Sequence, residues 1–393
     1  MAKISVVGLR GIPGVMGGVE THCEQIYPRL KALRPNDEFT IIARNGYVPR
    51  EPFHFAGVRV QGLWHARHKY LESITSTLAG VLYSRLVLRS EIIHFHAIGP
   101  ALLAPLARLL GARVVVTHHG QDYQRAKWNP MAKAALRFGE ICALRSAHAL
   151  VAVSPSLAED LKRRYPAHAE RIHYIPNGAN HGGRGPASPK AVDTVLRRFG
   201  LEPKRYILAV GRLVPEKGFH DLIAAYRRSG LDAKLVIVGA ADHRDEYADR
   251  LKAEADDSVV FTGFLGRDDV QGLLSASGLF VLPSYHEGLP IAALEAINAG
   301  APILLSDIQA NKDLGVSPEH YVKVGDVAAL TEGLQRGFGH FKAIPKSVAE
   351  PFDWDRVSEA TNEVYTTVQE SGWYGPGLKM VRPLRGTAVT RNR

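Results

Sequence analysis

The chain has 393 residues, of which 46% are hydrophobic and 22% are charged. This ordinary globular composition excludes a disordered chain, and the length favours two or three domains. Its two cysteines, Cys23 and Cys142, exclude a disulfide framework and a cysteine-based zinc site. We expect two free thiols in a reducing compartment. No apolar run approaches the roughly 18 residues of a membrane-spanning helix, and the first residues predict a strand rather than a signal peptide.

Positive charge is concentrated in the first half of the chain. The formal net charge is 49 − 39 = +10. Residues 1–175 contribute 23 − 12 = +11, residues 176–365 contribute 21 − 26 = −5, and residues 366–393 contribute 5 − 1 = +4. This distribution favours an anionic partner for the first half and the tail: phosphate, a membrane surface or nucleic acid. A nucleic-acid-binding protein is one alternative class, but no helix-turn-helix, finger or aromatic-basic repeat supports it.

Short apolar, β-branched runs alternate with helix-like segments along the chain. Near-continuous apolar runs are typical of strands buried on both faces of a parallel sheet, and the alternation predicts two doubly wound α/β domains. The expected strands are 4–9, 39–43, 58–63, 92–96, 114–117 and 150–153, then 206–210, 235–238, 259–261, 279–282 and 303–305. The expected helices are 19–33, 100–110, 130–144, 156–164, 189–199, 219–228, 269–274, 289–298 and 355–368. Within the first of these, Pro28 should kink or divide the helix.

A breaker-rich segment at residues 176–186 marks the domain boundary. We therefore expect an amino-terminal Rossmann-like domain over 1–180 and a second one over 190–365. Residues 366–393 should form a carboxyl-terminal crossover and basic tail, whose end we expect to be disordered.

Glycine-rich loops follow the first strand of each domain. Gly17 and Gly18 close a loop that begins at Gly8, between a strand and a helix, where a backbone can approach a phosphate. The dinucleotide spacing is not met, and a plain flexible turn is the alternative. In the second domain Arg212 and Lys217 stand between two glycines, and such cations suit a diphosphate. The alternative is two solvated surface cations.

Two carboxylates, Glu287 and Glu295, flank Gly288, Leu289 and Pro290. Proline fits the first turn of a helix, so Glu287 should lie in the preceding loop and Glu295 one to two turns into the helix. Carboxylates are natural acceptors for sugar hydroxyls. For Glu295 alone, a helix-surface acid is the alternative interpretation.

Two other constellations have the spacing of metal sites. His94, His96 and His118 end neighbouring predicted strands, and a His-x-His pair can bind a metal, so a metal-dependent hydrolase is the alternative enzyme. Asp353 and Asp355 form an Asp-x-Asp pair around a tryptophan, but at a helix start Asp is a common cap. We therefore expect no metal site, and we expect the tryptophan to lie in the core.

Taken together, the motifs resemble the retaining glycosyltransferases of family 4, from about residue 3 to about residue 365. The resemblance implies the GT-B fold, in which two Rossmann-like domains face across a cleft and the last helix crosses back to the first domain. The residues that carry it are 17–20, 151 and 154, 175–178, 211–218, 262–264 and 287–295. Residues 305–313 depart from the commoner family pattern. Residues 8–13, 118–122 and 127–128 are similar to a bacterial polysaccharide-assembly subgroup that includes rhamnosyltransferase-like members.

The resemblance assigns a role to each carboxylate and cation. Glu287 matches the residue that binds hydroxyls of the donor sugar, and Glu295 matches the one that holds the donor ribose. Arg212 and Lys217 match the cations that neutralise the leaving diphosphate. No enzyme nucleophile is required in the mechanism that the family is thought to use, because the leaving phosphate assists deprotonation of the acceptor.

The remaining assignments concern the sugar, the base and the diphosphate. His119 matches a histidine close to the sugar, and Phe264 lies in a loop that usually meets the nucleobase. Gly17 and Gly18 match a loop that approaches the diphosphate. The backbone N–H groups at Gly288 and Leu289 would add a helix N-terminus that stabilises the same charge. The resemblance implies no cofactor and no metal, only a uridine or guanosine diphosphate sugar as substrate.

We expect the acceptor to be a polyprenyl-diphosphate-linked oligosaccharide in exopolysaccharide, capsule or O-antigen assembly; a small soluble acceptor is the alternative. Residues 127–138 and 65–89 mix aromatic and apolar residues with cations, a pattern typical of an anionic headgroup surface. Packing of their apolar sides in the core is the other interpretation. The expected location is cytoplasmic, peripheral on the inner face of the cell membrane, with no nucleic-acid partner.

Overall fold

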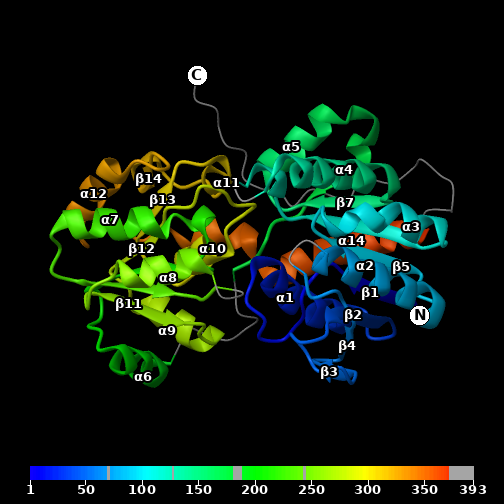
Figure 1. Cartoon of the computed structure of the whole chain (residues 1–393), viewed down its shortest axis with the longest axis horizontal. Helices are drawn as coiled ribbons and strands as arrows, with labels where there is room; N and C mark the ends of the chain where they lie inside the picture. Colours follow the sequence, from blue (N-terminus) through cyan, green and yellow to red (C-terminus); the bar gives the residue numbers. More distant parts are fainter. Residues whose placement is uncertain (69–70, 126–127, 180–187, 242–244, 371–393) are drawn as a thin grey trace. The chain divides into compact units, whose positions relative to one another are not determined.

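The computed structural model describes residues 1–68, 71–125, 128–179, 188–241 and 245–370, except for the side chain of Lys346. The chain forms two compact units (Figure 1). Unit 1 contains Met1–Val15, Val19–Asn177 and the helix that starts at Trp354, and unit 2 contains Met16–Gly18 and Gly178–Asp353. Most of the predicted linker and the predicted basic tail lie outside the described residues.

Unit 1 is built on an eight-stranded sheet with the order β3-β4-β2-β1-β5-β6-β7-β8. All neighbouring strands are parallel except β3 and β4, which are antiparallel. The strands are β1 (Lys3–Val7), β2 (Glu38–Arg44), β3 (Phe53–Phe55), β4 (Val58–Leu63), β5 (Ile92–His96), β6 (Arg113–His118), β7 (Ala149–Ala152) and β8 (Ile172–Tyr174). The α-helices are α1 (Gly18–Leu33), α2 (Glu72–Leu82), α3 (Ala104–Leu109), α4 (Pro130–Ser146), α5 (Pro155–Arg164) and α14 (Trp354–Glu370).

Unit 2 is built on a six-stranded, fully parallel sheet with the order β11-β10-β9-β12-β13-β14. The strands are β9 (Tyr206–Val210), β10 (Lys234–Val238), β11 (Val259–Gly263), β12 (Leu279–Leu282), β13 (Ile303–Ser306) and β14 (Tyr321–Val322). The helices are α6 (Pro189–Phe199), α7 (Phe219–Ser229), α8 (Glu246–Ala253), α9 (Arg267–Ala276), α10 (Ile291–Asn298), α11 (Gln309–Lys312), α12 (Val327–Gln335) and α13 (Lys346–Ala349).

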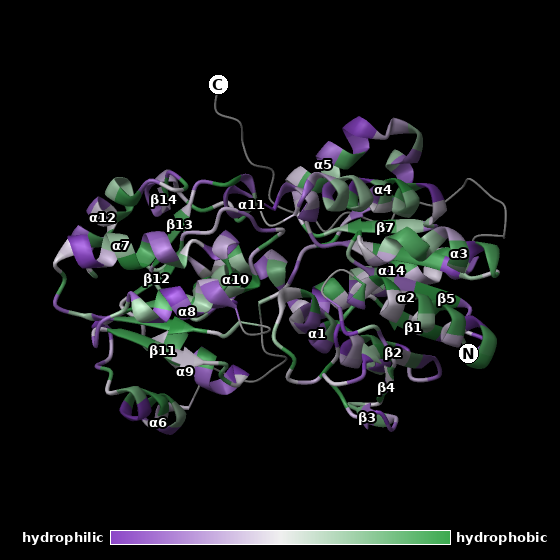
Figure 2. Ribbon diagram, in the orientation of Figure 1, coloured by the Kyte–Doolittle hydropathy of each residue, from purple (hydrophilic) through white to green (hydrophobic). Residues whose placement is uncertain are grey.

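The two sheets form the centre of each core. Strands such as β7 and β12 are buried over their whole length, and Figure 2 shows them mainly in the hydrophobic colour, while the helices alternate between the two colours. This is the pattern expected of parallel sheets covered on both faces. The prediction of two Rossmann-like α/β domains is confirmed.

The structure corrects three details of the prediction. The second unit ends at Asp353, not at residue 365, and α14 belongs to unit 1, where the buried Tyr365 packs on Phe39 of β2. Pro28 does not divide α1, which continues to Leu33, because Tyr27, directly before the proline, and Leu30, two positions after it, are fully buried in the core. The short edge strands β3, β8 and β14 were not predicted.

The order of strands reverses once in each sheet. In unit 1, β1 lies between β2 and β5, and in unit 2, β9 lies between β10 and β12. Open α/β sheets bind ligands outside the carboxyl ends of the strands at such a switch point. The loops after β1 and β5, and those after β9 and β12, are therefore where functional residues are expected.

Candidate active site

The switch point of unit 2 brings together two segments that lie about seventy positions apart. Gly211 follows β9 and Pro283 follows β12, and these strands are neighbours in the sheet. The close approach depends on Gly218, whose φ is +67°. A Cβ atom there would lie 2.3 Å from the carbonyl oxygen of Pro283, so only glycine fits.

Lys217 and Glu287 form an ion pair at this point. Lys217 Nζ lies 2.6 Å from Glu287 Oε1, and Ser284 Oγ donates to the same oxygen at 2.6 Å. The two charged side chains are 17% and 11% exposed. Desolvation raises the pKa of Glu287, but the charge of Lys217 and the two hydrogen bonds outweigh it, and the net shift is downward. Glu287 is thus held ionised, and its Oε2 can accept a hydrogen bond from a hydroxyl group.

Glu295 has a different electrostatic environment. It lies five positions into α10 and is partly buried, which confirms its predicted place in the helix. Desolvation raises its pKa to about 7, against the opposing charge of Arg267. Two carboxylates eight positions apart therefore differ: Glu287 is ionised at neutral pH, while Glu295 is poised between its two forms.

The other predicted donor residues of unit 2 lie in the same set of carboxyl-end loops. Arg212 directly follows Gly211 and is partly buried, as is Gly288, whereas Leu289 is buried. Phe264 is exposed in the loop after β11, and β11 lies two strands from β9. Lys217 and Glu287 are in direct contact; the binding roles of all these residues stay predictions.

The glycine-rich loop after β1 is held by an acid of the first turn of α1. Glu20 Oε1 accepts from the backbone N–H and from Nε of Arg10, both at 3.1 Å. Gly8, with a φ of +100°, has space for no Cβ, which would lie 2.4 Å from the carbonyl oxygen of His96. Gly17 precedes α1 and Gly18 begins it, with open space where its Cβ would be. That a phosphate group binds close to the backbone at the start of α1 remains a prediction.

His119 follows β6 and joins a cluster of histidines at the carboxyl end of the unit 1 sheet. Its Nε2 lies 2.9 Å from His96 Nδ1, and its ring makes an edge contact with His22 at 4.9 Å between centroids. His22 Nδ1 lies 2.9 Å from Asn177 Oδ1. Desolvation lowers the pKa of His22 to about 4 and that of His96 and His119 well below the usual range, so all three rings are neutral at pH 7.

The adjacent His118 belongs to a separate buried network. Its Nδ1 accepts from the backbone N–H of Gly120 at 3.2 Å, and its Nε2 lies 3.1 Å from Glu140 Oε2. Glu140, on α4, also accepts from Arg164 at 2.7 Å and from Tyr165 at 3.2 Å. This network holds the segment that follows His119.

The alternative metal-ligand set of His94, His96 and His118 does not come together as a group. Nitrogen atoms of His94 and His118 are engaged in different hydrogen bonds, and the histidines that come together in the described ranges are His22, His96 and His119. Trp354 is buried at the start of α14, as predicted, and Asp355 pairs with Arg29 at 2.6 Å.

Sequence reasoning missed Ser284, His22, Tyr27 and Asn177. Asn177 lies in the family-like segment 175–178 but was given no role, and no motif marked the other three, because their partners come from distant parts of the chain. Only the positions of Ser284, just after a predicted strand, and of His22, one turn into α1, could have suggested a role.

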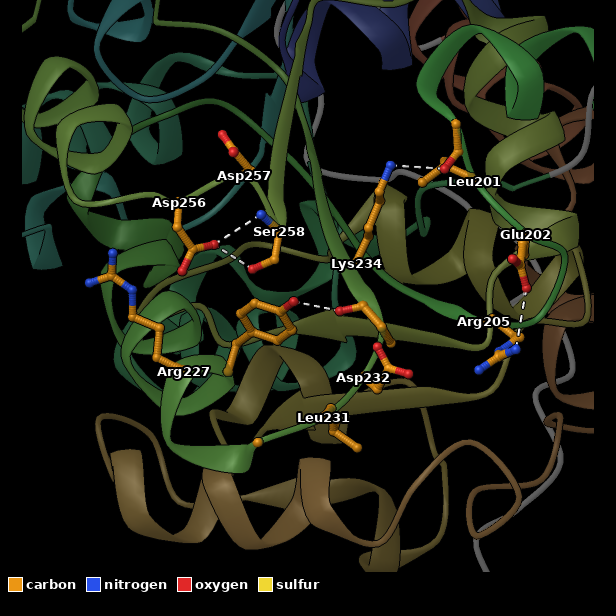
Figure 3. A pocket seen from close by; sticks show the side chains of 14 residues that line it. Leu201, Glu202, Arg205, Arg227, Leu231, Asp232, Lys234, Asp256, Asp257 and Ser258 are labelled. Atoms are coloured by element: carbon orange, nitrogen blue, oxygen red, sulfur yellow. Dashed lines mark hydrogen bonds and ion pairs between the residues drawn. The ribbon is translucent and has the colours of Figure 1, made fainter.

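A separate cavity lies at the other end of the unit 2 strands, next to their amino ends (Figure 3). It is lined by Lys234, which begins β10, and by Asp256 and Ser258, which precede β11. Its polar groups pair locally: Lys234 Nζ with the Gly200 carbonyl at 2.9 Å, and Asp256 with the backbone N–H of Ser258 at 2.9 Å. Because it lies at the amino ends of the strands, we do not assign the donor site to it.

Comparison with known proteins agrees with this geometry. Residues 16–182 match the model for Glycosyltransferase Family 4, and residues 194–336 match that for Glycosyl transferases group 1. The chain is 30% identical over 303 residues to 2-deoxystreptamine N-acetyl-D-glucosaminyltransferase of Streptomyces fradiae, covering 72% of this chain and 70% of the relative.

Two further similarities extend over more of the chain. It is 27% identical over 355 residues to the putative teichuronic acid biosynthesis glycosyltransferase TuaC of Bacillus subtilis, covering 87% and 85% of the two chains. The solved structure of sucrose-phosphate synthase from Thermosynechococcus elongatus covers 95% of this chain and all of its own, at a TM-score of 0.79 and 20% identity. The chain therefore belongs to the glycosyltransferases and has the GT-B fold.

Proposed function

We propose that the protein is a retaining glycosyltransferase of family 4 that uses a uridine or guanosine diphosphate sugar without a metal ion. The observation that carries the proposal is the Lys217–Glu287–Ser284 cluster at the switch point of unit 2. Breaking a bond between sugar and diphosphate builds negative charge on the phosphate oxygen. Lys217, Arg212 and the N–H groups at Gly288 and Leu289 would stabilise that negative charge in place of a metal ion.

Each carboxylate then takes the role that its environment suits. Glu287, held ionised beside Lys217, accepts hydrogen bonds from hydroxyl groups of the transferred sugar. Glu295, whose pKa lies near 7 in the empty site, ionises to accept from the ribose. His119 contacts the sugar, and unit 1 supplies the acceptor side. The leaving phosphate assists deprotonation of the acceptor hydroxyl, so no side chain is assigned as nucleophile.

We further propose a lipid-linked acceptor, a polyprenyl-diphosphate oligosaccharide in bacterial polysaccharide assembly, and membership of a subgroup that includes rhamnosyltransferase-like members. The similarity to TuaC, whose name refers to teichuronic acid biosynthesis, supports a polymer acceptor. A small soluble acceptor is the second candidate, and the similarity to a 2-deoxystreptamine glycosyltransferase favours it.

The surface of unit 1 supports a location on the inner face of the membrane. Helices α2, α3 and α4 are neighbours (Figure 1), and large apolar side chains are exposed on them and on the turn after α2. Within the described ranges, no helix is long and apolar enough to cross a membrane, so the proposed contact is peripheral. The exposed apolar residues in this region are Leu78, Leu82, Leu86, Val87, Leu109, Met131 and Phe138; the cations Arg89, Arg108 and Arg137 are exposed beside them.

A thermal-shift screen of nucleotide sugars tests donor binding. A ligand at about 100 times its dissociation constant adds about 2.7 kcal/mol to the free energy of unfolding. We expect one uridine or guanosine diphosphate sugar to raise the melting temperature of the wild type, and the Glu295→Ala variant to lose most of that shift. If no nucleotide sugar or nucleoside diphosphate stabilises the protein, the proposal is wrong.

A further inference from the structure

A chain of buried hydrogen bonds connects the carboxyl-terminal helix to His119. Tyr365 of α14 has its hydroxyl 2.7 Å from His94 Nδ1. The hydroxyl of Tyr27, on α1, lies 3.0 Å from the same nitrogen and 2.7 Å from His96 Nε2. His96 Nδ1 in turn lies 2.9 Å from His119 Nε2. The four residues before His119 have no exposed surface, and the proposed function gives them no role.

Both ring nitrogens of His96 form hydrogen bonds, Nε2 with Tyr27 and Nδ1 with His119. The direction of one of these bonds therefore fixes the direction of the other. A neutral imidazole has one N–H donor and one acceptor nitrogen, and desolvation keeps His96 and His119 neutral at pH 7. If Tyr27 donates to Nε2 of His96, then Nδ1 carries the proton and donates to His119. If Tyr27 accepts instead, the order reverses. The direction of one hydroxyl proton therefore decides which nitrogen of His119 is protonated.

The contacts of His94 and Tyr365 limit where the hydroxyl proton of Tyr27 can go. Its Nε2 lies 2.8 Å from Thr117 Oγ1, and its Nδ1 has Tyr365 nearer than Tyr27. A ring nitrogen takes part in one strong hydrogen bond, either as donor or as acceptor. If Nδ1 of His94 accepts from Tyr365, or if it donates to a tyrosine oxygen, two acceptors remain for the proton of Tyr27: His96 Nε2 at 2.7 Å and the hydroxyl oxygen of Tyr365, with which Tyr27 also forms a hydrogen bond. The short contact with His96 favours donation to His96 Nε2.

We propose that Tyr27 and His96 are positioning residues that hold His119 in the tautomer protonated at Nδ1. Tyr27 donates to His96 Nε2, His96 Nδ1–H donates to His119 Nε2, and the Nδ1–H of His119 remains as a hydrogen-bond donor. Tyr365 supports this order by engaging His94. The use of that N–H, donation to an oxygen of the transferred sugar, rests on the proposed function; the tautomer itself does not.

Long-range proton–nitrogen NMR correlation on the ¹⁵N-histidine-labelled full chain reads the tautomer directly. The His119 signals are assigned from their loss in His119→Gln. We expect Nδ1–H at His119 in the ligand-free wild type at pH 7, and a mixture or the Nε2–H form in Tyr27→Phe. Tyr83→Phe is the matched control, because Tyr83 bonds to Gln61 and lies outside the chain of hydrogen bonds; it should keep the wild-type tautomer.

An Nε2–H form in the wild type overturns the proposal, whether or not Tyr27→Phe folds. A folded Tyr27→Phe protein with an unchanged His119 tautomer overturns the role of Tyr27. Stoichiometric zinc in the purified protein, bound by His22, His96 and His119, also overturns it, because metal at His96 Nδ1 replaces the hydrogen bond.

Kinetics separate positioning from a general loss of structure. Tyr27→Phe should lower kcat roughly three- to tenfold, the value of one neutral hydrogen bond, while the affinity for the bare nucleoside diphosphate stays unchanged. Equal loss of kcat and of nucleoside diphosphate affinity contradicts a positioning role. If the predicted tautomer is found but no nucleotide sugar is turned over, the proposed function fails and the tautomer assignment stands.

Discussion

At the scale of single residues, Glu287 and Glu295 should contribute to different steps. If Glu287 contacts the sugar, Glu287→Ala lowers turnover more than donor affinity. Glu295→Ala should in addition weaken the binding of the nucleoside diphosphate that lacks the sugar. Each lost charged hydrogen bond is worth about 1.5–3 kcal/mol, roughly 10- to 150-fold. Titration calorimetry with the nucleoside diphosphate measures this. If Glu287→Ala is defective in binding and Glu295→Ala is not, the two roles are reversed.

The raised pKa of Glu295 adds a pH dependence to the same measurement. The carboxylate is ionised above about pH 7 and protonated below it, and the ionised form is the better acceptor for two ribose hydroxyls. Affinity for the nucleoside diphosphate should therefore fall as the pH drops from 8 to 6. Glu295→Gln is the control, because the phosphate groups of the ligand titrate equally with both proteins. Parallel pH profiles for the two proteins would contradict a titrating ribose contact.

The residue pairs show what sequence could and could not predict. Motif and resemblance selected Lys217 and Glu287 separately, and the structure joins them because β9 and β12 are neighbours. Ser284 and Tyr27 were not predictable, since a serine after a strand and a tyrosine in a helix are common. Their roles arise only from partners far along the chain.

At the scale of elements, Glu140 ties α4 and α5 to the end of β6. Desolvation raises its pKa, but hydrogen bonds from His118 and Arg164 outweigh this and lower it from 4.5 to about 2. A carboxyl group whose pKa is lower in the folded than in the unfolded protein stabilises the fold at pH values above its unfolded-state pKa. This stabilisation is lost as the pH falls through the folded-state pKa. About 3 kcal/mol should therefore be lost between pH 4.5 and 2.

Urea denaturation at pH 7, 4.5 and 3 measures this contribution. Glu140→Gln should be less stable than the wild type at pH 7, and the difference should shrink as the pH falls. Glu159→Gln, an exposed change on α5, is the control and should follow the wild type. A constant difference between Glu140→Gln and wild type at all three pH values would contradict the assignment.

Regular elements were the most predictable part of the fold. Long apolar runs such as β5 and β12 were located to the residue, because burial on both faces leaves a continuous hydrophobic signal. The edge strands β3 and β14 have three and two residues, too few for a pattern to emerge. The predicted division of the helix at Pro28 does not occur, because packing of the neighbouring side chains outweighs the local preference of proline; a kink there stays a prediction.

At the scale of the whole molecule, the charge distribution predicts where a membrane would bind. Vesicle co-sedimentation should show binding that requires anionic lipid and weakens steeply with salt. Arg137→Gln removes one exposed cation beside Phe138 and should weaken binding roughly fivefold, from about 1 kcal/mol per cation. Arg228→Gln, on α7 of unit 2, is the matched control and should have no effect. Equal recovery in the supernatant with neutral and anionic vesicles at low salt would favour a soluble acceptor.

The central claim, metal-independent transfer of a sugar from a nucleoside diphosphate, is tested most directly by measuring both products in one assay. With the nucleotide sugar that stabilises the protein and an acceptor extract in excess EDTA, we expect one nucleoside diphosphate released for each sugar transferred. Glu287→Ala should reduce both products together. Loss of transfer in EDTA, with recovery on addition of Mn²⁺ or Mg²⁺, would contradict the account, because Lys217, Arg212 and the backbone N–H groups would then not suffice to stabilise the leaving diphosphate.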